Sequence, residues 1–144
     1  MCLISKTNTP LIAEKDIVVY KVLMRKNGKD YAPVVSEDSG LPHYIYNKGV
    51  NKARLKEDVD YAWSKYVGAW DYMYRIGKGF LHAYTTKDGA EKNKDNWNLC
   101  MSASAYYREG KFHFVTKMII PKGTKYFLSD DGYEICAKQL LWED

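Results

Sequence analysis

The sequence has few cysteines, and their spacing argues against two common ways of stabilising a small protein. Cys2, Cys100 and Cys136 are odd in number and widely separated, and none stands in a Cys-x-x-Cys or Cys/His pattern. Neither a disulfide framework nor a zinc site is therefore predicted, and a reducing, cytoplasmic setting is favoured. A chain of 144 residues buries about 68–70% of the surface that its unfolded form exposes, which supplies a core without cross-links.

Long apolar runs and clustered charges are also lacking. No segment approaches the roughly 20 apolar residues of a transmembrane helix, so no membrane span is predicted. The 22 Lys and Arg residues and 18 Asp and Glu residues are scattered and give a formal net charge of +4. Because nucleic-acid binding proteins typically carry a clustered basic stripe, specific nucleic-acid binding is not expected. No repeat, linker or low-complexity tract interrupts the chain, so residues 1–144 are expected to form a single globular domain.

What the sequence does contain is a series of strand patterns. The β-branched and aromatic run from Ile17 to Leu23 predicts a central strand. Alternating apolar residues predict strands over residues 70–76 and 80–84, joined as a hairpin or a bent ribbon, and a hairpin of 99–107 with 112–120. Residues 27–49 are rich in Gly, Pro, Asp and Ser, which predicts a long irregular loop with a short strand at 43–46.

Two helices are considered, one with a clear pattern and one with a weaker pattern. The first pattern is an apolar stripe at helical spacing, formed by Leu55, Val59, Ala62, Trp63 and Tyr66. It predicts an amphipathic helix over about 52–66. Thr85, Thr86 and Asp88 could cap a second short helix over about 86–94, but Gly89 and the Asn-rich tail weaken it, so it stays an open alternative. The predicted fold class is α+β, with a mostly antiparallel sheet.

The segment from Met118 to Trp142 has turn residues at two points. Pro121 cannot donate to a strand ladder and therefore ends a strand, while Gly123 lets the backbone reverse. Asp130-Asp131-Gly132 predicts a second turn. The expected order is strand, turn, short strand, turn and strand.

This closing segment, with Pro-Lys-Gly-Thr at 121–124, resembles the end of the mono-ADP-ribosyltransferase fold. The resemblance places Lys21, in VVYKVL, where the family has a basic residue that holds the dinucleotide. It places Tyr84 and Thr85 at an altered Ser-Thr-Ser motif and Gln139 at the position of the catalytic Glu. It implies a ligand site of Lys21, Tyr84, Thr85 and Gln139, with NAD as a possible ligand. An amide carries no negative charge and is no base, so binding without turnover is implied; an active divergent transferase is the alternative.

Both ends of the chain are similar to small uncharacterised proteins of gut Bacteroidetes and their phages. Those proteins open much as MCLISK does here and carry stretches like IAEKDIVVYKVL and IIPKGTKY. That similarity brings no known activity with it.

Three further features offer candidate sites, each with a plain alternative. Removal of Met1 would leave Cys2 with a free α-amino group, which N-terminal cysteine hydrolases use as nucleophile and base; the alternative is an ordinary packed residue. His43, His82 and His113 could supply a base, although their spacing matches no metal motif. The aromatic residues between 63 and 84 could form a stacking platform or fill the core.

The sequence as a whole favours a cytoplasmic binding module over an enzyme. The expected partner is a nucleotide-like ligand or another protein. The alternatives are the active transferase and the cysteine hydrolase.

Overall fold

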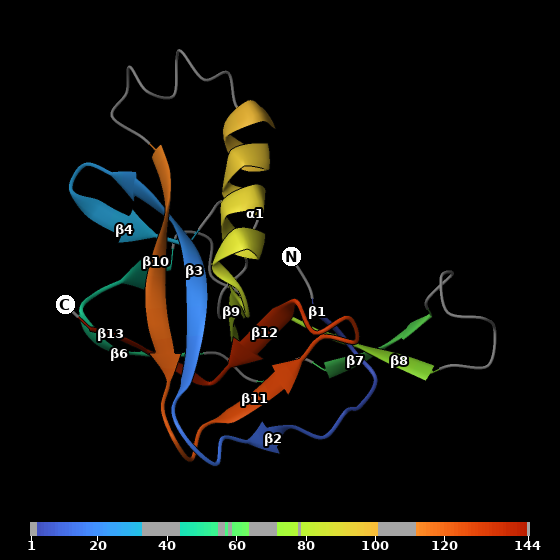
Figure 1. The fold of residues 1–144 in the computed structure, drawn as a ribbon. Coiled ribbons are helices and arrows are strands. Elements are labelled where there is room, and N and C mark those ends of the chain that lie inside the picture. The colour runs from blue at the N-terminus through green and yellow to red at the C-terminus, as the bar shows by residue number, and fades with distance from the viewer. Residues whose placement is uncertain are drawn as a thin grey trace.

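Antiparallel strands make up most of the fold, and one helix packs against them (Figure 1). The computed structural model describes residues 3–32, 44–54, 57, 59–63, 72–77, 79–100 and 112–143. The helix is α1 (Lys87–Cys100). The strands are β1 (Leu3–Ser5), β2 (Leu11–Ile12), β3 (Ile17–Lys26), β4 (Lys29–Tyr31), β5 (Ile45–Tyr46), β6 (Gly49–Lys52), β7 (Val59–Trp63), β8 (Tyr72–Ile76), β9 (Leu81–Tyr84), β10 (Phe112–Ile120), β11 (Lys125–Leu128), β12 (Glu134–Ala137) and β13 (Gln139–Trp142).

The β3 strand lies at the centre of the larger of two sheets, as the sequence predicts. It pairs along most of its length with β10, from Ile17 opposite Ile120 to Arg25 opposite Phe112. Its other side pairs with β9 and β4. The strand order is β2-β11-β12-β9-β3-β10-β13-β6, while β4 joins β3 to β5. The smaller sheet has the order β1-β8-β7.

The larger sheet curls back on itself because two consecutive strands pair on opposite sides of β3. β12 pairs with β9, whereas β13 pairs with β10, and only Lys138 separates β12 from β13. The Lys138 N–H donates to the Lys125 carbonyl at 3.0 Å, and the Lys138 carbonyl accepts the Ala53 N–H at 2.9 Å. The bent segment β12–β13 thus gives the sheet a barrel-like interior.

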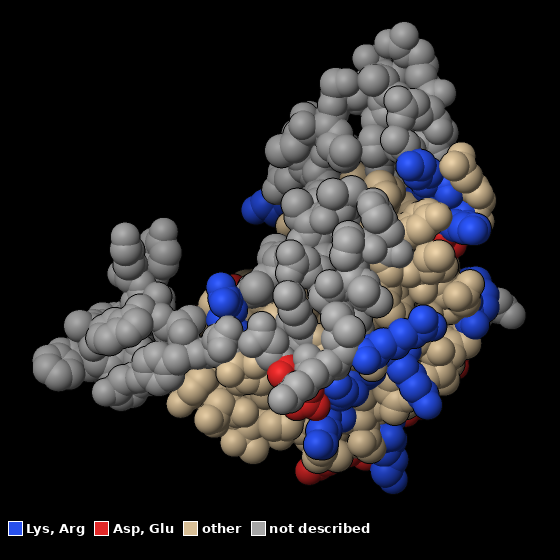
Figure 2. All heavy atoms as spheres, turned by 180° about the vertical axis from the view of Figure 1, so that it is seen from behind, with Lys and Arg blue, Asp and Glu red and all other residues tan. Residues whose placement is uncertain are grey.

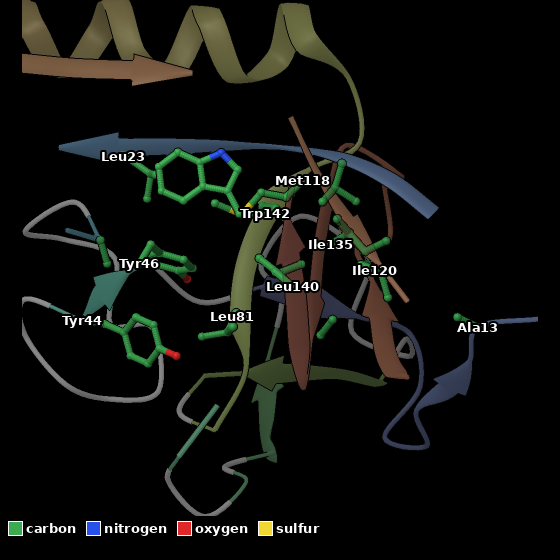
Figure 3. Close-up of a cluster of buried hydrophobic side chains, with 14 residues drawn as sticks. Ala13, Leu23, Tyr44, Tyr46, Leu81, Met118, Ile120, Ile135, Leu140 and Trp142 are labelled. Atoms are coloured by element: carbon green, nitrogen blue, oxygen red, sulfur yellow. The ribbon is translucent and has the colours of Figure 1, made fainter. Parts of the chain in front are cut away.

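Three clusters of buried apolar side chains hold the fold together. The largest fills the barrel-like interior (Figure 3), with Val19, Leu23, Leu81, Met118, Ile120, Ile135, Leu140 and Trp142 among its members. The second lies on the outer face under α1 and contains Val22, Tyr84 and Ala90. The third joins the two sheets and consists of Leu3, Ile76, Phe80, Phe127 and Cys136. Alternate residues of β3 thus face different cores, which is why the strand carries apolar residues on both faces, at 17–20 and 22–24.

The predicted helix at 52–66 is wrong. Val59–Trp63 is the strand β7, which pairs with β8 from Val59 opposite Ile76 to Trp63 opposite Tyr72. The helical spacing of apolar residues coincides here with a stretch of Val, Tyr and Trp, which suit a pleated strand. The segment is a strand because it pairs with β8 and because Val59 contacts the third cluster.

The described part of the chain holds one helix, not two. This helix, α1, overlaps the prediction at about 86–94, whose sequence pattern is the weaker of the two. α1 begins at Lys87, where Thr86 Oγ1 accepts the Gly89 N–H at 3.1 Å as an N-terminal cap. The helix continues to Cys100, so the predicted strand at 99–107 is wrong at its start, and residues 101–111 lie outside the described residues. Within the described residues, no helix is both long and apolar enough to cross a membrane.

Most of the other predicted strands are present in the structure. β10 covers 112–120, and the closing segment forms β11, β12 and β13 with Gly123 and Gly132 at positive φ. β5 falls within the short strand expected at 43–46. A hairpin of 70–76 with 80–84 is not formed, because β8 and β9 belong to different sheets.

Candidate functional site

A tight hairpin between β3 and β4 forms one wall of the candidate site. Asn27 and Gly28 adopt φ angles of 53° and 73°, and Lys26 pairs with Lys29 across the turn. Asn-Gly with both residues at positive φ is typical of the two-residue turn that matches the twist of paired strands. The residues before and after the turn therefore lie at a well-defined end of the sheet.

An ion pair fixes the first cation of this wall. Arg25 Nε lies 2.8 Å from Asp30 Oδ1, and its terminal nitrogen lies 3.2 Å from Asp30 Oδ2. The hydrogen bond to Asp30 raises the pKa of the Arg25 guanidinium above its ordinary value. The guanidinium carbon also lies 4.8 Å from the centre of the Phe114 ring. A partly exposed ion pair adds little to stability, so its main consequence is a fixed orientation of Arg25.

A hollow of about 260 Å³ opens beside the hairpin. Its lining residues come from β3, β4, β5 and the end of β13, and they are Arg25, Gly28, Lys29, Asp30, Ile45, Tyr46, Asn47, Lys48 and Trp142. Three of them are cations and one is an acid, which Arg25 already binds. Lys and Arg side chains gather on the side of the molecule that carries β4 and β6, the right-hand side in Figure 2.

Two lysines near the hollow lie against aromatic rings. Lys48 Nζ lies 4.2 Å from the Trp142 ring centre and donates to the Glu143 carbonyl at 3.3 Å. Lys21 Nζ lies 5.2 Å from the ring centre of Tyr46, whose side chain also lines the hollow. We call the hollow with Arg25, Lys29 and Lys48 the hairpin site.

Lys21 and Tyr84, two of the four predicted site residues, lie on opposite faces of the larger sheet. Lys21 is 3% exposed and points into the barrel-like interior, where its ammonium donates to the His82 carbonyl. Tyr84 pairs with Tyr20 and packs under α1. The strand alternation that buries both side chains also separates them.

Thr85 and Gln139, the other two, each form a hydrogen bond to a different turn of the fold. Thr85 Oγ1 donates to the Gly132 carbonyl at 2.7 Å, which ties the end of β9 to the turn before β12. Gln139 Nε2 donates to Thr124 Oγ1 at 3.1 Å, so the amide meets the Pro-Lys-Gly-Thr turn. The four residues are therefore not brought together into one cleft. A role for any of them in ligand binding stays a prediction.

The remaining candidates include residues inside the described part of the chain and residues outside it. His113 is buried on β10, and burial lowers its pKa. His82 Nε2 lies 3.1 Å from the Gly77 carbonyl oxygen. Tyr74 and Tyr84, from the proposed stacking platform, both pack against core clusters. Cys2 and His43 lie outside the described residues, and the described ranges hold no group of three potential metal ligands of the His, Cys, Asp or Glu type.

A scan against protein-family models and searches of curated proteins and of solved structures found no match to this chain. The case for a function therefore depends on the geometry of the hairpin site and of the sheet around it.

The hairpin site is not among the sites that the sequence predicts. Asn27-Gly28 between alternating residues is a strong local sign of a hairpin, yet the composition of 27–49 predicts an irregular loop there, with a short strand only at 43–46. The cations of the site lie at separate points of the chain, at 25, 29 and 48, so no basic cluster marks them in the sequence. The Asn-Gly turn was the available signal, and it would have located two of the three.

Proposed function

We propose that this protein is a binding module for a small anionic, nucleotide-like ligand, and that the hairpin site takes the ligand's phosphate. The observation that carries the proposal is the excess of cations around the hollow: Arg25, Lys29 and Lys48 against Asp30. Charge-assisted hydrogen bonds from guanidinium and ammonium groups are the usual means of phosphate recognition in proteins.

The size of the hollow limits the ligand. Its volume of about 260 Å³ lies just below the range of about 300–1,000 Å³ that drug-sized ligands occupy. A phosphate with its sugar fits this space, whereas a dinucleotide such as NAD would extend beyond it. The Trp142 ring is only 5% exposed and is covered by Lys48. The proposal therefore relies on the phosphate and not on base stacking.

Titration calorimetry with AMP and with adenosine tests the proposal. We expect AMP to bind with a Kd between about 10 μM and 1 mM, and adenosine to bind at least about tenfold more weakly. Lys29→Glu should reduce AMP affinity by at least about tenfold, because it reverses a charge at the hollow. Lys122→Glu is the matched control, since Lys122 is exposed in the turn after β10 and does not line the hollow. Equal affinities for AMP and adenosine, or an equal loss in both variants, would contradict the phosphate site.

The active transferase remains the second candidate function, and the same samples test it. It is supported by the resemblance of the closing segment, while Gln139 in place of a carboxylate argues for binding without turnover. An assay for nicotinamide release from NAD separates the two. Release by the unchanged protein that disappears in Lys21→Ala would support catalysis. No release, together with AMP binding, would support the binding module.

A further inference from the structure

The outer edge of β6 faces away from the rest of the larger sheet. β6 ends the strand order in the part of the chain that the structure describes, and its inner edge pairs with β13. The Ala53 N–H donates to the Lys138 carbonyl, and antiparallel pairs alternate between bonded and non-bonded residues. The backbone groups of Asn51 therefore point toward β13, while those of Val50 and Lys52 point outward. The Tyr44 hydroxyl, which donates to the Lys52 carbonyl at 2.6 Å, reaches it from that outer side.

A hollow of about 450 Å³ runs along this edge. Its lining residues are Tyr44, Ile45, Asn47, Val50, Asn51, Lys52, Ala53 and Arg54. Val50 is 54% exposed and Ile45 is 41% exposed. The N–H and C=O of Val50 and the N–H of Lys52 thus point toward this hollow.

The Asn51 side chain holds the edge in shape. Asn51 is 5% exposed, and its Nδ2 donates to the carbonyls of Asn47 at 2.9 Å, Gly49 at 3.2 Å and Leu140 at 3.4 Å. Its Oδ1 accepts the Asn47 N–H at 3.0 Å. The turn into β6 is fixed in this way, so an incoming strand meets a preorganised edge and does not have to order it.

A row of apolar side chains continues from β6 across the outer face of the sheet. Val50 lies opposite Leu141, Leu141 opposite Ile119, and Ile119 opposite Val18, on four neighbouring strands. Directly opposed residues share one face of a sheet. Val18 is 45% exposed, and Ile119 and Leu141 are half-buried. An added strand at β6 could place an apolar side chain beside Val50 and extend this row.

Charge selects the kind of chain that this edge would accept. Lys52 and Arg54 line the hollow, and Lys48 precedes β6, whereas residues 47–54 contain no acid. An acidic segment is complementary to these cations. A second copy is not, because two β6 strands in antiparallel contact would bring both sets of cations together.

We propose that β6 accepts an extended, acidic segment of a partner protein as an additional antiparallel strand. Backbone hydrogen bonds to Val50 and Lys52 provide the docking, as in other cases of strand addition. Acidic side chains of the segment contact Lys52 and Arg54, and an apolar side chain contacts Val50. This proposal does not depend on the hairpin site.

Fluorescence anisotropy with four labelled peptides tests the mode of binding. The first is Glu-Thr-Glu-Thr-Val-Thr-Glu, which can place an acid opposite Lys52 and the valine opposite Val50 on one face of the sheet. The second has Lys in place of each acid, and the third and fourth are the acidic peptide with alternate amides methylated in the two possible registers. We expect the acidic peptide to bind with a Kd below about 1 mM and the basic peptide to bind at least about tenfold more weakly. The two registers of amide methylation should differ, because only the amides that face β6 donate to it. Equal binding of all peptides, or none up to about 1 mM, would overturn the proposal.

Two substitutions test the position of the edge. Val50→Pro removes an outward N–H, and proline is tolerated at the edge of a sheet; we expect at least about a tenfold loss of peptide affinity. Val50→Ala, which keeps the N–H, should lose less, and Lys29→Glu should lose nothing. If Val50→Pro does not fold, the methylated peptides with the unchanged protein still decide. The acidic partner would be refuted if folded Val50→Pro kept its full affinity for the peptide. It would also be refuted if the unchanged protein formed dimers in sedimentation without peptide and Val50→Pro abolished them.

Discussion

The two ends of the larger sheet, β2 and β6, expose apolar side chains to a similar extent but differ in charge. Leu11 and Ile12 of β2 are 49% and 53% exposed, close to the 54% of Val50 in β6. Each edge borders a hollow, of about 480 Å³ at β2 and about 450 Å³ at β6. Glu14 and Lys15 are both among the lining residues of the β2 hollow, whereas the described residues that line the β6 hollow include the cations Lys52 and Arg54 and no Asp or Glu.

This difference shows that exposed apolar area alone does not select a docking edge. Both edges would be equally suitable by area, and isolated exposed apolar residues are ordinary on protein surfaces. What distinguishes β6 is its fixed backbone, its length of four residues against two for β2, and its charge of one sign. β2 is therefore the natural internal control for every experiment on β6.

The largest effect is expected from Asn51→Ala, which removes the fixed backbone of β6. The substitution leaves buried carbonyls and the Asn47 N–H without the side chain that they contact. Unsatisfied buried polar groups typically cost 1–3 kcal/mol, so we expect the free energy of unfolding to fall by about 2–3 kcal/mol. Urea denaturation measures this change, and acidic-peptide binding should weaken in the same variant.

The control for Asn51→Ala is Asn8→Ala, because Asn8 is exposed in the turn between β1 and β2. Its free energy of unfolding should change by no more than about 0.5 kcal/mol. A loss in Asn51→Ala that is no larger than in Asn8→Ala would mean that β6 does not depend on the Asn51 hydrogen bonds.

A smaller effect is expected on the β2 side of the sheet, at the turn between β11 and β12. Burial, followed by repulsion from Asp131, raises the pKa of Glu134. A raised carboxyl pKa means that the fold favours the neutral form. Stability from this group is therefore present below the ordinary pKa of Glu and is lost as the pH rises through the folded-state value. Asp131 shows the opposite direction, because hydrogen bonds from Ser129 and from the Tyr133 N–H lower its pKa.

Glu134→Gln should therefore stabilise the protein at neutral pH and not in acid. We expect Tm at pH 7 to rise by roughly 2–4 °C relative to the unchanged protein. The gain should vanish as the pH falls below the ordinary pKa of Glu, where the unchanged protein is already neutral at this position. Thermal unfolding followed by circular dichroism across this pH range checks the sign, with the exposed Glu14→Gln as the control for the loss of one charge. A gain of equal size at all pH values would contradict the role of burial.

Local patterns predicted the strands whose pairing partners are unambiguous. β3 and β10 have residues suited to strands along their whole length, and Pro121, Gly123 and Gly132 mark the turns of the closing segment. The error at 52–66 arose where one set of residues satisfied both a helical and a strand pattern. The helical pattern and the strand pattern are equally compatible with these residues. The pairing of β7 with β8 in the folded protein decides for the strand.

The candidate sites were harder to predict, because they depend on the curl of the sheet. From the sequence, Lys21 is a candidate ligand-binding residue, yet the bend at Lys138 closes the sheet over it and puts it in the core. The same bend brings β13 beside β10 and β6 beside β13, which creates both the hairpin site and the open edge. A one-residue break between two strands carries no sequence signal of this consequence.

The smallest effect is expected when the charge of the β2 edge is made to resemble that of β6. Glu14→Lys replaces the acid at the β2 hollow by a second lysine, without altering the apolar residues or the backbone there. If charge alone made β6 an acceptor of acidic strands, this variant would bind the acidic peptide at β2 as strongly as β6 does. We expect only a slight gain, of about twofold or less in affinity, because β2 offers two residues and lacks a side chain that plays the part of Asn51. The measurement is peptide anisotropy in a Val50→Pro background, which removes the β6 contribution. A gain of tenfold or more would show that charge outweighs preorganisation, and the distinction between the two edges would then depend on charge alone.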